Sequence, residues 1–120
     1  MTILLIDNDE DFRQALAENL RDDGHRVLEY PTPVDVPLDQ LEGVDLTITD
    51  YLMNGEDGLA FANRFHRSRP GVPVVLVTAY ATKLVEQAVK NSGFLSLLHK
   101  PLDYGRMERL ITDLTGYRPA

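Results

Sequence analysis

Short apolar segments alternate along this chain with segments in which apolar residues recur at helical spacing. The short segments are typical of buried strands, and they cover residues 2–6, 25–30, 44–49, 72–77 and 94–98. The second of them alternates apolar and polar residues, as an edge strand does. Helical spacing joins four further sets, from Phe12 to Leu20, Leu59 to Phe65, Leu84 to Val89 and Met107 to Leu114. The pattern therefore predicts alternating strands and helices.

Turn and capping residues indicate where the helices begin and end. Gly24 and Gly93 stand where helices usually stop, and Asp103 is the expected N-cap of the last helix. Three prolines interrupt the stretch between the second and third strands, so only a short helix from Pro37 to Glu42 fits there, with Asp35 or Val36 near its start.

Strand and helix alternate five times, which is typical of a parallel sheet with helices on both faces. We find no repeat, low-complexity tract or linker, and we expect residues 1–120 to form a single domain. The predicted architecture is a three-layer doubly wound α/β domain. In such a sheet a site forms beyond the carboxyl ends of the strands, where the strand order switches.

Composition narrows the possible functions. Hydrophobic residues make up 43% of the chain and charged residues 26%, as in a globular domain, and no apolar run is long enough to cross a membrane. There is no cysteine, and the N-terminus lacks the basic region of a signal peptide, so we expect a cytoplasmic protein. The net charge of −7 disfavours direct binding to nucleic acid, and the acids are concentrated in residues 1–63.

Polar side chains follow the central strands where each one ends. They are Asp7-Asn8-Asp9, Asp50, Thr78 and Lys100. Two carboxylates a few Å apart repel by about 4 kcal/mol at an effective dielectric constant near 20, so a cation is needed among them. Oxygen ligands without His or Cys suit Mg²⁺. A hydroxyl and an ammonium beside Asp50 would suit a phosphate.

These residue types indicate phosphoryl transfer to a carboxylate. Asp50 would attack a phosphoryl donor and become an acyl phosphate. Mg²⁺ held by Asp7, Asn8 or Asp9 and by Asp50 would neutralise the transferring group. Lys100 and the Thr78 hydroxyl would stabilise its remaining oxygens.

At these residues the sequence resembles the response-regulator receiver domain of two-component signalling, the CheY-like superfamily. The motifs are ILLIDNDEDFR, DLTITDYLMNGEDG, VLVTAY and LLHKPL, which stand in the order and at the spacing of that family across the whole chain. The resemblance implies a flavodoxin-like fold of five strand–helix units, with a five-stranded parallel sheet in the order 2-1-3-4-5. It also implies a protein that catalyses only its own phosphorylation and dephosphorylation.

The resemblance assigns a role to each residue of the site. It implies that Asp50 is the phosphoacceptor, and that Asp7, Asn8 and Asp50 bind Mg²⁺ together with the backbone carbonyl of Leu52. Asp9 would compensate for the charge that Asn8 lacks. The residues that would sense the phosphoryl group are Thr78, Ala79 and Lys100. The peptide bond before Pro101 is often cis in the family.

Three residues depart from the family pattern. Asn8 replaces an acid, so we expect weaker metal binding, and Asn54 replaces a proline, so we expect a less rigid loop after Asp50. Leu97 replaces the aromatic switch residue, so the usual coupling of a hydroxyl to a moving ring is lost. Leu52 and Tyr80 occupy the positions that tune dephosphorylation, and since neither acts as a general base, we expect slow loss of phosphate.

The resemblance also predicts partners. The donor would be a sensor histidine kinase or a phosphotransfer protein. The signal would leave through residues 83–91, 94–98 and 104–114, to a downstream protein or a second copy of the chain. We expect one receiver domain without an output domain, without direct nucleic acid binding and without a membrane partner.

Three alternatives stay open on the sequence. A pseudo-receiver would act without phosphorylation, which the changes at Asn8 and Leu97 favour, although Asp50, Thr78 and Lys100 are present. A haloacid-dehalogenase-type phosphatase would use Asp7 as its nucleophile. A nucleotide- or flavin-binding domain is disfavoured because the chain has no G-x-G-x-x-G motif and no P-loop.

Overall fold

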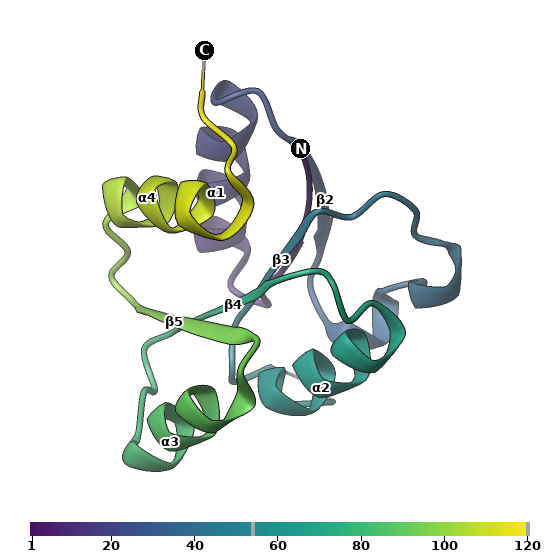
Figure 1. The fold of residues 1–120 in the computed structure, drawn as a ribbon, viewed down its shortest axis with the longest axis vertical. Coiled ribbons are helices and arrows are strands. Elements are labelled where there is room, and N and C mark those ends of the chain that lie inside the picture. Colours follow the sequence, from purple (N-terminus) through teal and green to yellow (C-terminus); the bar gives the residue numbers. More distant parts are fainter. Residues whose placement is uncertain (54, 120) are drawn as a thin grey trace.

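The centre of the molecule is a five-stranded parallel sheet (Figure 1), seen in a computed structural model that describes residues 1–53 and 55–119. The strands are β1 (Thr2–Ile6), β2 (Arg26–Tyr30), β3 (Leu46–Thr49), β4 (Val74–Thr78) and β5 (Leu95–His99). Their order is β2-β1-β3-β4-β5, which confirms the predicted doubly wound topology. The predicted third and fourth strands each began two residues too early.

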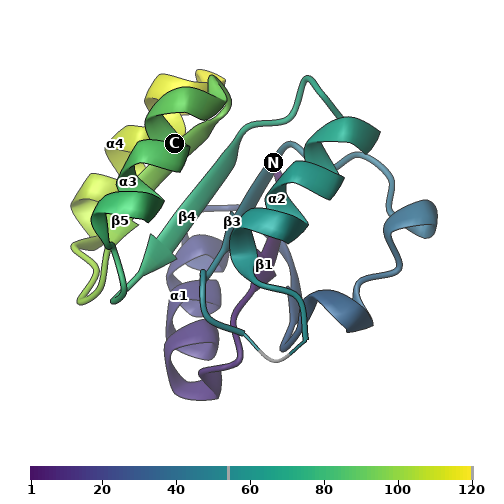
Figure 2. The same ribbon diagram turned by 90° about the horizontal axis from the view of Figure 1, so that it is seen from below.

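Two helices cover each face of the sheet, so the domain has three layers (Figures 1 and 2). The helices are α1 (Glu10–Asp22), α2 (Gly58–Ser68), α3 (Lys83–Ser92) and α4 (Tyr104–Thr115). In the views, α1 and α4 lie on one side of the sheet, and α2 and α3 lie on the other. Each helix begins after a capping residue whose side chain accepts a backbone N–H of the first turn, and the predicted cap Asp103 accepts that of Gly105 at 2.9 Å.

The alternation of side chains along the strands builds two cores. In β1, Ile3 and Leu5 face the α1/α4 side, and Leu4 and Ile6 face the α2 side. The first core includes the α4 residues Met107 and Ile111, and the second includes the α2 residues Phe61 and Phe65. Strands buried on both faces explain why their sequences are continuously apolar.

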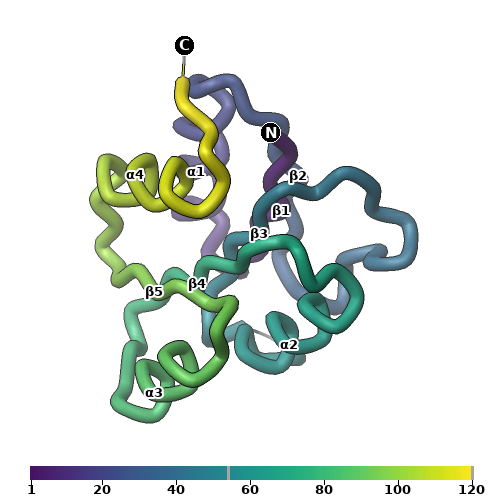
Figure 3. The backbone as a smooth tube through the Cα atoms, viewed as in Figure 1, coloured from purple at the N-terminus to yellow at the C-terminus, as the bar shows by residue number. Residues whose placement is uncertain are grey.

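The segment between β2 and β3 differs from the prediction. In place of one helix from Pro37 to Glu42, it forms two single 3₁₀ turns, Pro33–Asp35 and Leu38–Gln40, so four of the five strand–helix units contain an α-helix. The prolines explain this, because each lacks the N–H that a longer helix needs. The tube in Figure 3 shows this segment extending away from the sheet. The Arg69 guanidinium holds it by donating to the carbonyls of Leu38 (2.9 Å) and Leu41.

The exposed surface carries one further correction. The helical spacing predicts Leu84 on the apolar face of α3, but this residue is 84% exposed, and Val85 is the residue buried on that helix. No helix in the described part of the chain has both the length and the apolar character that crossing a bilayer requires.

Candidate functional site

Asp7, Asp50 and Lys100 meet beyond the carboxyl ends of three strands. The register aligns Ile6 with Thr49, so the next residues, Asp7 and Asp50, leave the sheet side by side. Lys100 follows β5, and its Nζ lies 2.7 Å from Oδ2 of Asp7 and 2.8 Å from Oδ2 of Asp50. This end of the sheet is the lower end in Figure 2, where the chain turns from β1 into α1. One ammonium therefore supplies the positive charge that the two carboxylates need.

Backbone groups hold both carboxylates in place. The N–H of Asp9 donates to Oδ1 of Asp7 at 2.9 Å, and the N–H of Tyr51 donates to Oδ1 of Asp50 at 2.5 Å. Asp7 is 1% exposed and Asp50 is 7% exposed. Each carboxylate thus has one oxygen fixed by the backbone and the other turned to Lys100.

Burial and ion pairing shift the pKa values of Asp7 and Lys100. Burial raises the pKa of Asp7 above its ordinary value, against the opposing effects of its hydrogen bonds to Lys100 and the Asp9 N–H. Burial alone would lower the pKa of Lys100, but the hydrogen bonds to Asp50 and Asp7 outweigh it, so that pKa is raised. Lys100 is therefore charged at neutral pH.

The residues next to Asp7 and Asp50 have different surroundings. The Asn8 side chain is exposed, and so is Leu52. Asp9 caps α1, because its Oδ1 accepts the N–H of Phe12 at 3.1 Å. Asn54, where we expected a less rigid loop, lies outside the described residues.

The donor set fits Mg²⁺. Within residues 1–53 and 55–119 there is no group of three or more acidic or histidine side chains that could hold a metal ion. Two carboxylates are nevertheless adjacent here, and Mg²⁺ is commonly held by one or two carboxylates with water and phosphate oxygens completing its octahedron.

Thr78 is fully buried, and its hydroxyl is engaged by its own loop. Its Oγ1 accepts the N–H of Tyr80 at 3.1 Å, and its carbonyl accepts the N–H of Lys100 at 3.0 Å. The Tyr80 ring is 57% exposed, and Ala79 is also exposed. The backbone of Thr78 is thus joined to that of Lys100, while its hydroxyl contacts its own loop.

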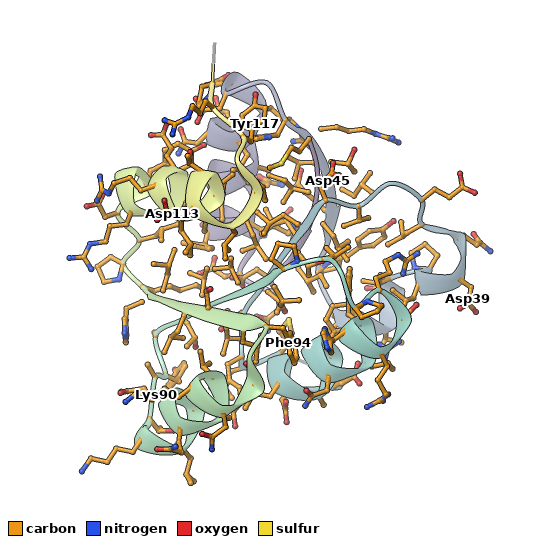
Figure 4. All side chains as sticks on the ribbon, in the orientation of Figure 1. Asp39, Asp45, Lys90, Phe94, Asp113 and Tyr117 are labelled. Carbon is orange, nitrogen blue, oxygen red and sulfur yellow. The ribbon has the colours of Figure 1, made fainter. Side chains whose placement is uncertain are left out.

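Leu97 and Pro101 lie on the β5 side of the site. Leu97 is half-buried and lines a groove of about 370 Å³ against α3, whose exposed residue Lys90 is labelled in Figure 4. The Lys100–Pro101 peptide bond is cis.

Sequence reasoning missed three residues at this site. The ring centroid of Phe12 lies 4.1 Å from Nζ of Lys100, and Arg13 donates to the Asp7 carbonyl at 2.8 Å. A side chain at Gly58 would meet the Asp50 carbonyl oxygen at 2.0 Å. Phe12 and Arg13 lie in the first turn after Asp7, and Gly58 begins α2, so their nearness to strand ends was a usable indication.

The chain matches the model of a known protein family. The family model of the response regulator receiver domain matches residues 3–112, and the chain belongs to this family. The family is the one that the sequence resembles at its strand ends, and it is not that of haloacid-dehalogenase-type phosphatases. The domain is thus a receiver of two-component systems.

Individual proteins are similar to most of this chain. The chain is 29% identical over 112 residues to the transcriptional regulatory protein GlrR of Escherichia coli K12, covering 92% of this chain and 25% of that protein. It is 33% identical over 114 residues to an uncharacterized 14.6 kDa protein in the sodA1 3' region of Leptolyngbya boryana, covering 92% and 87%. The chain therefore spans about a quarter of the length of GlrR.

Solved structures show the same fold. A two-component response regulator from Clostridium difficile superposes with a TM-score of 0.87 at 21% identity, covering 95% of this chain and 94% of that one. A CheY-like response regulator receiver domain protein from Methanospirillum hungatei JF-1 superposes with a TM-score of 0.85 at 22% identity, covering 94% and 92%.

Proposed function

We propose that this receiver domain takes a phosphoryl group onto Asp50 from the phosphohistidine of a sensor histidine kinase or phosphotransfer protein. The observation that carries the proposal is the contact of Lys100 with both Asp7 and Asp50 at the carboxyl ends of β1, β3 and β5. A carboxylate with a neighbouring acid for a metal and an ammonium for a phosphoryl oxygen is the set of groups that the reaction needs.

The transfer itself requires one bond to form and one to break. A carboxylate oxygen of Asp50 attacks phosphorus, and the bond from phosphorus to the donor nitrogen breaks with its electron pair staying on the donor imidazole. The ammonium of Lys100, which contacts Oδ2 of Asp50 at 2.8 Å, then pairs with an oxygen of the transferred group. The Tyr51 N–H holds the other oxygen of Asp50 and so orients the nucleophile.

Asp7 and Asp50 would hold Mg²⁺, together with the carbonyl of Leu52, the amide of Asn8 and, in addition, Asp9. When bound, the ion supplies charge neutralisation for the phosphoryl oxygens. Asn8 contributes an oxygen without charge, so we expect binding to be weaker than with an acid at this position. Because both carboxylates now pair with Lys100, a metal held by them would compete with the ammonium for their oxygens.

We further propose that the phosphoryl group changes the face formed by α3, β5 and α4. The Thr78 hydroxyl would leave the Tyr80 N–H to bind a phosphoryl oxygen, which would release the loop before α3. That face carries the exposed bases Lys83, Lys90, Arg106 and Arg109. Its partner would be a downstream protein with acidic groups or a second copy of the chain.

The test is the intact mass of the protein after incubation with acetyl phosphate, with and without Mg²⁺. We expect wild type to gain one phosphoryl group with Mg²⁺, Asp50→Asn to gain none, and Asn8→Asp to react faster than wild type. Asp39→Asn is the matched control, because Asp39 is an exposed acid on a distant turn (Figure 4). Phosphorylation of Asp50→Asn would overturn the assignment. No uptake by wild type or Asn8→Asp would favour the pseudo-receiver.

A further inference from the structure

The Phe12 ring covers the ammonium of Lys100. Phe12 is in the first turn of α1, and its ring centroid lies 4.1 Å from Nζ of Lys100, which also contacts Asp7 and Asp50. A cation within about 6 Å of an aromatic centroid is attracted by the negative face of the ring. The ammonium is therefore held by two carboxylates and by one aromatic face.

The ring is itself fixed in place. The N–H of Phe12 donates to the capping side chain of Asp9 at 3.1 Å, which anchors the first turn of α1. One part of the ring packs against the core between the sheet and α1, and another part lines a groove of about 260 Å³ with Leu102 and Tyr104. A leucine at this position would keep an apolar side chain against that core while removing the aromatic face.

A lysine side chain needs such support. Lys100 has a flexible four-carbon stem, and an ammonium can contact a carboxylate from many directions, because it acts as a point charge. The two carboxylates attract the ammonium but do not fix which side of them it occupies. The ring lies on a third side and restricts the ammonium to the space between Asp7 and Asp50.

We propose that Phe12 is a positioning residue, whose aromatic face holds the Lys100 ammonium where it meets the incoming phosphoryl group. The part of the proposal that concerns the reaction rate rests on the proposed function. Packing of any apolar side chain on the lysine stem is the competing explanation. The two differ because only an aromatic face with a negative quadrupole attracts the charge.

The position of the ammonium can be measured without phosphorylation. The chain has three lysines, Lys83, Lys90 and Lys100, so few ε-methylene NMR signals are expected. The signal that is missing in Lys100→Met is that of Lys100. A ring face shields protons above it. We expect an upfield Lys100 signal in wild type and in Phe12→Tyr, and a position like that of Lys83 in Phe12→Leu. A Lys100 signal unchanged in Phe12→Leu would overturn the proposal.

The effect on the reaction is measured with acetyl phosphate and Mg²⁺. We expect the rate of phosphoryl uptake to fall about threefold to tenfold in Phe12→Leu, and Phe12→Tyr to restore it. Replacing Phe12 with mono-, di- and trifluorinated phenylalanine weakens the face while keeping the apolar contact. A rate that falls stepwise along this series supports the proposal, and a flat series overturns the role of the aromatic face.

Phe94→Leu is the matched control. Phe94 is also a half-buried phenylalanine, but it precedes β5 and stacks on His66 with centroids 3.9 Å apart, and it is labelled in Figure 4. We expect this variant to keep both the Lys100 signal and the rate. If wild type takes up no phosphoryl group, the proposed function fails, and the NMR comparison alone decides whether Phe12 positions Lys100.

Discussion

Gly58 allows α2 to begin against the backbone of Asp50, and Gly58→Ala is expected to disrupt this contact. A Cβ at this position would lie 2.0 Å from the Asp50 carbonyl oxygen, 2.8 Å from the Asp50 carbonyl carbon and 2.9 Å from the Tyr51 Cα. All three atoms belong to the backbone, so no side chain can turn away to make room. The Gly58 N–H also donates to the Tyr51 carbonyl at 2.8 Å.

The size of the effect follows from these distances. Ordinary contacts of a Cβ begin near 3.4 Å, so the start of α2 or the loop must retreat by more than 1 Å. Such overpacking costs about 1–3 kcal/mol, and loss of the hydrogen bond adds about 1 kcal/mol. The better helix propensity of alanine returns less than about 1 kcal/mol. We expect a net loss of about 2–3 kcal/mol in the free energy of unfolding, or about 10 °C in Tm for a chain of this size.

The assay is urea denaturation with a thermal scan, and Gly105→Ala is the control. Gly105 also lies in the first turn of a helix, α4, but a Cβ there would meet only side-chain atoms of Asp103 at 3.2 Å and Arg109 at 3.4 Å. That variant is expected to lie within about 0.5 kcal/mol of wild type or to be more stable. Equal stabilities for the two variants would refute the reasoning. Because two of the three contacted atoms belong to Asp50, Gly58→Ala is also expected to slow phosphoryl uptake.

Three further predictions concern the pH dependence, the stability and the phosphate lifetime of this domain. The raised pKa means that folded Asp7 binds its proton more tightly than unfolded Asp7, so ionised Asp7 destabilises the fold. The free energy of unfolding of Asp7→Asn should therefore rise relative to wild type as the pH increases above 3.8. Denaturation curves at neutral pH that show no gain would contradict this. Tyr104→Phe loses the hydrogen bond that the Tyr104 hydroxyl donates to Asp23 at 2.8 Å. The free energy of unfolding should fall by about 1 kcal/mol in urea denaturation. An unchanged midpoint would show that water replaces this bond. Tyr80→Ala should shorten the phosphate half-life measured after the donor is removed, because an exposed ring then no longer screens the acyl phosphate, and an equal half-life would exclude that role.

The sequence predicted the sheet because periodicity and burial are linked by simple geometry. Strands such as β1 and β4 are covered on both faces and read as unbroken apolar runs, while β2 at the edge mixes apolar residues with Arg26 and Glu29. The segment with the two 3₁₀ turns could not be predicted in the same way, because prolines exclude a helix without specifying what replaces it. Contacts with other elements, among them the hydrogen bonds from Arg69, help to set its path.

The site was predictable in its chemistry and less so in its geometry. Asp7, Asp50 and Lys100 could be grouped because they follow parallel strands, whose carboxyl ends share an edge. The contact of Phe12 with Lys100 could not be found from periodicity, since an aromatic residue on the apolar face of a helix is expected to pack in the core. The rotamer of Thr78, whose hydroxyl accepts the Tyr80 N–H, depends on the path of its loop.

The strand–helix unit that begins with β2 has no α-helix, and the Arg69 guanidinium ties its connecting segment to the end of α2. It leaves the end of α2, lies over the Phe65 ring at 5.6 Å, and holds two carbonyls of the segment between β2 and β3. Within the segment, backbone hydrogen bonds are confined to short turns such as those closed by Val36 and Gln40, so the two bonds from Arg69 add a tie to a neighbouring element. Removing that side chain should open the segment to proteases while the sheet stays intact, and the first cut would fall there.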